Sequence, residues 1–124
     1  MQQDPRPYSS MAFKLILLDY DDVHSDVRGH PSAVILSALL AVGEPEMTGK
    51  RFLAAYGWCG NHGSVRGSYE PISLYKGWHN TATLGVIAAA GAVAYLREYS
   101  PRLIAETMSL AATQSAGLRL NLAL

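Results

Sequence analysis

The stretch YKGWHNTATLGVIAAAGAV, Tyr75 to Val93, decides the fold of this chain. Its centre is a run of small apolar residues, whose glycines and alanines let neighbouring backbones approach closely. Asn80 or Thr81 suits the N-terminal cap, because short polar side chains accept hydrogen bonds from the free amides of a first helical turn. The pattern predicts a central, buried helix that runs to about Glu98. Its apolar run is shorter than the roughly 20 residues that a membrane span needs, so we expect no membrane partner.

Helix signals also stand on both sides of this stretch. Proline suits a first helical turn, and glycine or a following proline suits the end of a helix. Sustained apolar–polar alternation is absent, with Ala12 to Leu18 as the one possible exception. The sequence therefore predicts an all-α fold. The other expected helices run from Pro31 or Ser32 to Gly43, from a Thr48 cap through Tyr56, and from a Ser100–Pro101 start to Gly117.

Composition limits the class of protein. The chain has 124 residues, which is enough for one domain at most. Lys+Arg and Asp+Glu both number 10, and this balance argues against a nucleic-acid partner, which would require a basic face. The single Cys59 excludes an internal disulfide and fits a reducing compartment. The N-terminus lacks the basic-then-apolar pattern of a signal peptide, so we expect a cytoplasmic location.

A second informative block is DYDDVHSDVRGHPSAV, Asp19 to Val34. It combines a tight cluster of aspartates with His30, and His79 occupies a similar place before the central helix. Carboxylates and imidazoles gathered in this way are the usual groups of proton transfer. From the residues alone, aspartates that cap helices and histidines that are satisfied in loops remain the competing interpretation. The acidic residues near His24 are too loosely spaced for a metal site, and we expect no metal and no cofactor.

Together with SLAATQSAGLR, Ser109 to Arg119, these blocks resemble the MmgE/PrpD family, which includes 2-methylcitrate dehydratases, cis-aconitate decarboxylases and an iminodisuccinate epimerase. The resemblance covers Leu18 to Lys50 and Leu74 to Arg119, about two-thirds of the chain. It implies the partial helical domain of that fold, with the α/β lid domain absent. It also implies a small polycarboxylate substrate, acid/base removal of a proton, water or carbon dioxide without a metal, and a homodimer in intact members.

The resemblance assigns roles to three residues. Asp19 is the first aspartate of the DYDD string, His30 precedes Pro-Ser, and His79 is the histidine of the second block; all three are implied to be catalytic. Two departures weaken the match. Val23 stands where many members have threonine, and the Thr-Lys-Pro…His string expected after Arg119 is absent. The chain is therefore expected to be a lyase or isomerase fragment that is inactive alone.

Three segments depart from the family pattern: an irregular N-terminal segment 1–17, a displaced loop 57–71 within the helical domain 18–119, and a displaced tail 120–124. The segment GWCGNHGSVRGSYEP, Gly57 to Pro71, has no apolar period, and a loop this long inside a compact domain is uncommon. Codon degeneracy allows a shifted frame to read G-V-E-I-M-A-R-L-G-x-A-M-N-P there, which is a helix followed by a turn. Similar shifts are possible at both ends. We therefore expect a frame-damaged gene, which the nucleotide sequence can decide.

Two alternatives remain. The first is a small helical interaction module without catalysis. The second starts from FKLILLDYDDVH, Phe13 to His24, which looks like a buried strand ending in Asp-x-Asp and resembles the first motif of haloacid-dehalogenase-like phosphotransferases. Against it, the chain lacks a later lysine on an α/β framework and a downstream acidic pair. The helical pattern also does not fit alternating strands and helices.

Overall fold

The computed structural model describes residues 14, 18, 21–23, 29–60 and 76–118. These residues form four helices and no strand. An isolated antiparallel bridge joins Trp78 to Leu118. The all-α prediction is therefore confirmed for the part of the chain that the structure describes. The helices are α2 (Pro31–Val42), α3 (Gly49–Gly60), α5 (Asn80–Leu96) and α6 (Pro101–Ala112).

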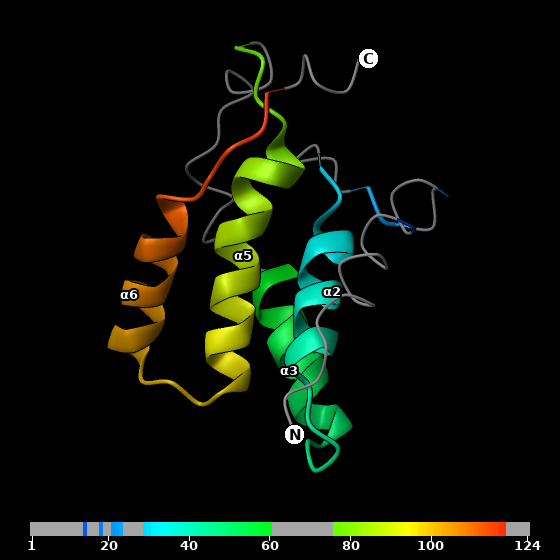
Figure 1. The fold of residues 1–124 in the computed structure, drawn as a ribbon. Coiled ribbons are helices and arrows are strands. Elements are labelled where there is room, and N and C mark those ends of the chain that lie inside the picture. Colours follow the sequence, from blue (N-terminus) through cyan, green and yellow to red (C-terminus); the bar gives the residue numbers. More distant parts are fainter. Residues whose placement is uncertain (1–13, 15–17, 19–20, 24–28, 61–75, 119–124) are drawn as a thin grey trace.

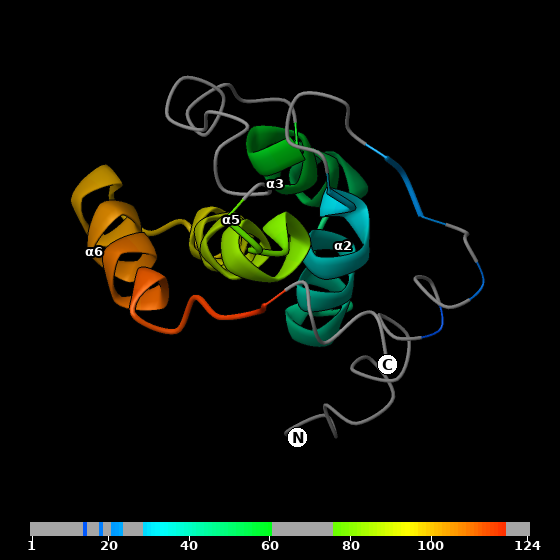
Figure 2. The ribbon, with the colours of Figure 1, turned by 90° about the horizontal axis from the view of Figure 1, so that it is seen from above.

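Helix α5 is the centre of the fold. Figures 1 and 2 show it between α6 on one side and α2 with α3 on the other. Helices α2 and α5 begin at the same end of the molecule, which is the end at which α6 finishes (Figure 1). Nine residues of α5 are buried and none of α6 is, so the expected central helix is confirmed while α6 is peripheral.

The core forms where α2, α3 and α5 meet. Its fully buried side chains are Ile35, Leu39, Ala55, Ala92 and Leu96. The small residues of α5 set how closely its neighbours approach. A Cβ atom on Gly85 would lie 3.0 Å from Cγ2 of Val34, which is closer than ordinary packing allows. The absence of a side chain at this position therefore lets α2 lie directly against α5.

Helix α3 is four residues longer than predicted. It ends at Gly60 and not at Tyr56, so the displaced loop expected from Gly57 is wrong for residues 57–60. The extension has a physical reason in Trp58, whose ring stacks on Tyr95 of α5 with centroids 5.8 Å apart and planes inclined by 16°. The remainder of that expected loop, residues 61–71, lies outside the described residues.

Helix α6 is shorter than predicted, because it ends at Ala112 and not at Gly117. After the helix, the Ser115 hydroxyl donates to the carbonyl oxygen of Thr83 at 2.8 Å, which draws the chain along α5. Gly117 then takes a φ of +112°, a conformation that favours glycine. The tail thus continues beside α5 and does not extend the helix.

The end of α5 also differs slightly from expectation, because the helix stops at Leu96. Glu98 adopts a left-handed φ of 57°. The Tyr99 amide donates to the Ala94 carbonyl at 3.1 Å and the Glu98 amide to the Tyr95 carbonyl at 3.0 Å. These two bonds form a Schellman motif, which satisfies carbonyls at the end of a helix. The position normally prefers glycine, so the glutamate at residue 98 did not indicate this turn.

Of the N-terminal residues 1–20, the structure describes only Lys14 and Leu18. Within Ala12 to Leu18, the Leu18 amide donates to the Lys14 carbonyl at 3.0 Å, which is a helical spacing and not that of a strand. This contact counts against the phosphotransferase alternative. The rest of segment 1–17 and the tail 120–124 lie outside the described residues. No helix in the described part of the chain is both long and apolar enough to cross a bilayer.

Replacing Gly85 with alanine should lower the free energy of unfolding by about 1–3 kcal/mol, because the new methyl group would press on Val34. Gly57→Ala is the matched control, since nothing lies within 4 Å of its Cβ position. This control should be neutral or stabilising by up to about 1 kcal/mol, through higher helix propensity. Urea denaturation measures both variants. Equal effects would show that α2 and α5 are not closely packed at Gly85.

Candidate functional site

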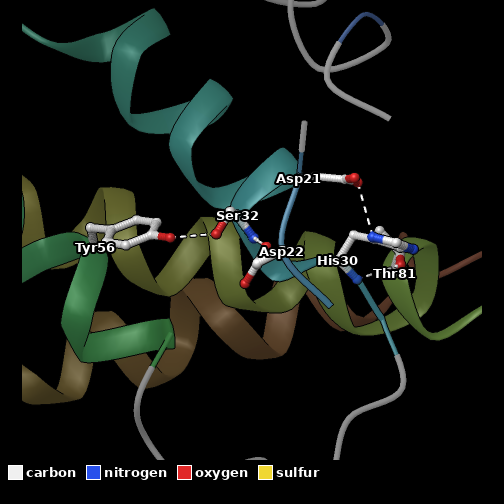
Figure 3. Close-up of polar contacts among 6 residues, drawn as sticks. All are labelled: Asp21, Asp22, His30, Ser32, Tyr56 and Thr81. Carbon is white, nitrogen blue, oxygen red and sulfur yellow. Dashed lines mark hydrogen bonds and ion pairs between the residues drawn. The ribbon is translucent and has the colours of Figure 1, made fainter. Parts of the chain in front are cut away.

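The start of α2 is fixed by a carboxylate from outside the helix. His30 is the N-cap residue and Pro31, which follows it, has no amide hydrogen to satisfy. The next amide, that of Ser32, donates to Oδ1 of Asp22 at 2.9 Å. The Ser32 hydroxyl in turn forms a hydrogen bond with the hydroxyl of Tyr56 on α3 (Figure 3). Asp22 therefore caps α2 from ten residues away.

The same end of α2 is bound to the first turn of α5. The backbone amide of His30 donates to Oγ1 of Thr81 at 3.0 Å (Figure 3). Gly29 lies against this threonine, because a Cβ atom at residue 29 would be 3.1 Å from Oγ1 and 3.3 Å from the Thr81 amide nitrogen. Thr81 is itself buried. The loop before α2 is thus held directly on the start of α5.

The side chain of His30 contacts a second aspartate. Its Nδ1 atom lies 2.9 Å from Oδ2 of Asp21. A dashed line marks this contact in Figure 3. The Asp21 side chain is only 2% exposed, whereas that of His30 is 31% exposed. Both contacting atoms are buried, and neither has a hydrogen-bond partner among the described residues. The contact is therefore a close approach of a carboxylate oxygen to an imidazole nitrogen, and a buried pair of this kind calls for an explanation.

His79 is the N-cap residue of α5. Its amide donates to the carbonyl oxygen of Gly117 at 3.0 Å, and its carbonyl accepts from the amides of Ala82 and Thr83, both at 3.0 Å. The tail after α6 therefore holds the entry to α5 in place. The bridge between Trp78 and Leu118 lies next to these bonds.

The two predicted histidines thus precede two adjacent helices that start at the same end of the fold. The contact between His30 and Thr81 confirms the expectation that the central helix begins beside the loop carrying His30. Asp19 lies outside the described residues. The catalytic role of all three residues stays a prediction. Sequence reasoning missed Thr81 as the partner of His30 and assigned no separate role to Asp21.

The electrostatics at this end combine helix dipoles with two carboxylates. The first turns of α2 and α5 carry no acidic side chain, and the dipole at a helix N-terminus attracts negative charge. At the start of α2 the Asp22 carboxylate already supplies that charge, and the Asp21 carboxylate lies beside it at His30. Among the described residues, no three His, Cys, Asp or Glu side chains gather in a way that could hold a metal ion.

Comparison with known proteins places the chain in a family. The family model of the MmgE/PrpD N-terminal domain matches residues 12–123. The chain belongs to the MmgE/PrpD family. A relative named cis-aconitate decarboxylase-like protein oryM, from Aspergillus oryzae (strain ATCC 42149 / RIB 40), is 33% identical over 111 residues. The match covers 82% of this chain but 23% of the relative, so the chain spans about a quarter of that relative's length.

The contact between α2 and α5 of this MmgE/PrpD domain can be tested at Thr81. Thr81→Val removes the acceptor of the His30 amide at nearly constant volume and should destabilise the domain by about 1–3 kcal/mol. Thr81→Ser keeps the hydroxyl and is the control. Hydrogen exchange of the His30 amide should accelerate in the valine variant and stay slow in the serine variant. Unchanged exchange in the valine variant would contradict the contact.

Proposed function

We propose that this chain contributes proton-transfer groups to an MmgE/PrpD-type lyase or isomerase that acts on small di- or tricarboxylates. The observation that carries the proposal is the hydrogen bond from the His30 amide to Thr81, which brings the starts of α2 and α5 together. Both predicted histidines therefore precede helix N-termini at one end of the fold. Family membership and the name of the Aspergillus relative support the same class of chemistry.

The chemistry follows from the properties of these groups. Carboxylates of the substrate would be attracted to the helix dipole at the start of α5, since the Asp22 carboxylate already caps the start of α2. His30 and His79, with Asp19, would remove or deliver the proton whose transfer accompanies loss of water, loss of carbon dioxide or epimerisation. A positioned acid or base contributes roughly 10²–10⁴ in rate. Which of these reactions occurs depends on the substrate, and the match to a cis-aconitate decarboxylase-like relative makes cis-aconitate the first one to test.

We further propose that the described helices supply only one side of this site. The match covers 23% of the Aspergillus relative. A small polycarboxylate also needs cationic partners to hold it. Lys76, a cation near the start of α5, is exposed, so we expect further cationic partners to come from the rest of the intact protein. The 124-residue chain is therefore expected to be inactive by itself. The predicted cytoplasmic location stays a prediction.

Activity can be measured with cis-aconitate and 2-methylcitrate. One sample is the 124-residue chain, and the other is a longer chain with the three displaced segments restored and the remaining C-terminal sequence of the Aspergillus relative appended. Activity is expected only in the longer chain, and His30→Ala or His79→Ala should each lower it at least about 100-fold.

Glu106→Ala is the matched control, because Glu106 is exposed and pairs only with Arg102 in the described part of α6. This variant should retain full activity. Turnover by the 124-residue chain would refute the incomplete site. Full activity in both histidine variants would favour the alternative interpretation, in which the polar contacts near His30 only cap helices.

Helix α6 supports one further part of the proposal, association with a second copy of the chain. No residue of α6 is buried, and Leu103 and Leu110 are 42% and 70% exposed. The two leucines are seven residues apart, about two helical turns, so they lie on one face of α6 and would be covered together by a second copy. A homodimer would be the simplest assembly that covers this face.

Sedimentation analysis should therefore show concentration-dependent dimerisation of the unmodified chain. Leu110→Glu should weaken it at least tenfold by placing a charge in the covered face. Leu53→Glu is the control, since Leu53 is 66% exposed on α3, away from α6. A chain that is monomeric at all concentrations, or equal weakening by both variants, would contradict dimerisation through α6.

A further inference from the structure

We propose that Asp21 is a positioning residue that keeps the ring proton of His30 on Nδ1 and thereby presents Nε2 as the atom that exchanges a proton with the ligand. The statement about Nε2 rests on the proposed function, whereas the position of the ring proton does not. Neither the sequence pattern nor the family resemblance assigned this role, because both pointed to Asp19.

The first argument is the chemistry of the contact. An ionised carboxylate can only accept hydrogen bonds, so the atom that faces it must carry a proton. Oδ2 of Asp21 and Nδ1 of His30 are both buried and lie 2.9 Å apart, and neither atom has a hydrogen-bond partner among the described residues. With the proton on Nε2, the negative carboxylate oxygen would lie beside the lone pair of Nδ1 in a buried place. The Nδ1–H form replaces that repulsion with attraction between the ring proton and the carboxylate.

The second argument is that Nδ1 is buried while other atoms of the same side chain are accessible. The His30 side chain is 31% exposed, yet Nδ1 contributes no accessible surface. The accessible part of the side chain therefore excludes the nitrogen that Asp21 holds. Nε2 is the one ring nitrogen left to meet a ligand. In the Nδ1–H form it carries a lone pair and can accept a proton.

The third argument is that both partners are anchored to the fold. The His30 backbone is bound to Thr81 of α5, and Asp22, the neighbour of Asp21, is bound to the Ser32 amide of α2 (Figure 3). The geometry between the carboxylate and the ring thus depends on two packed helices. Such outer partners orient a functional imidazole and fix its tautomer.

The consequence for proton transfer is direct. When Nε2 takes a proton from the ligand, the bonding electron pair stays on the ligand and the ring becomes an imidazolium. Its positive charge then lies next to the buried Asp21 carboxylate, which stabilises it. The return of the proton from Nε2 restores the Nδ1–H form without any rearrangement of the contact.

The test is a nitrogen-15 NMR measurement of the histidine side chains in the 124-residue chain, at alkaline pH where imidazole rings are neutral. His30→Gln identifies the His30 signals among the four histidines. In the unmodified chain, Nδ1 of His30 should resonate as the protonated nitrogen and Nε2 as the bare one. Asp21→Asn should reverse this pattern, because the amide of the new side chain can donate to Nδ1.

Asp22→Asn is the control, because it removes the same charge one residue away and leaves the contact with His30 intact. It should not alter the His30 pattern. A proton on Nε2 of His30 in the unmodified chain would overturn the proposal, even if neither aspartate variant folded. An unchanged pattern in a folded Asp21→Asn variant would also overturn it. The tautomer is measured without substrate, so it tests the role of Asp21 even if the proposed activity is absent. Likewise, the activity assay tests the proposed function even if the ring proton of His30 is not on Nδ1.

Discussion

The close approach of α2 to α5 is the constraint on which the rest of the structure depends. Gly85 has no side chain to separate the two helices, so Val34 lies directly against its backbone. About one turn earlier in α5, Oγ1 of Thr81 accepts a hydrogen bond from the His30 amide at the start of α2. The apolar contact sets the distance between the helices, and the polar contact fixes how their N-terminal ends meet. Both contacts involve α5, whose small residues also admit Trp58 and Met108 beside Gly91.

The acidic cluster shows how neighbouring aspartates take different roles. Asp22 satisfies the Ser32 amide and caps α2, while Asp21 is buried against the ring of His30. A purely structural interpretation therefore accounts for Asp22. It accounts less well for Asp21, since burying a carboxylate is costly and a loop histidine does not need one. This difference is the reason to separate helix capping from the positioning of a proton-transfer group within one short string.

The C-terminal ends of the helices are held by arginines from neighbouring elements. Arg97 donates to the Val42 carbonyl at the end of α2, and Arg51 donates to the Leu96 carbonyl at the end of α5. Cations are favoured at this end, as anions are at the other. The described helices are thus polarised: arginines bind the C-terminal carbonyls of α2 and α5, while their N-terminal amides and the two histidines lie together at the opposite end.

The sequence by itself determined the helical class of the described residues and two of the local caps. Its expected cap for the central helix, Asn80 or Thr81, was one or two residues late, because His79 is the N-cap residue of α5. The Thr48 hydroxyl accepts a hydrogen bond from the Arg51 amide, and the Ser100 hydroxyl accepts one from the Leu103 amide. Short-range capping rules predict both bonds, because donor and acceptor are three residues apart. Only the tertiary structure decided which residues meet across the chain. Asp22 accepts a hydrogen bond from an amide ten residues away, and Thr81 accepts one from an amide 51 residues away. Trp58 extends α3 by stacking on Tyr95. The ends of α3 and α6 were therefore mispredicted, because long-range contacts and not propensity set them. The two aspartates differ for the same reason. A sequence motif pointed to Asp19, whereas the contact of Asp21 with His30 depends on how the chain packs.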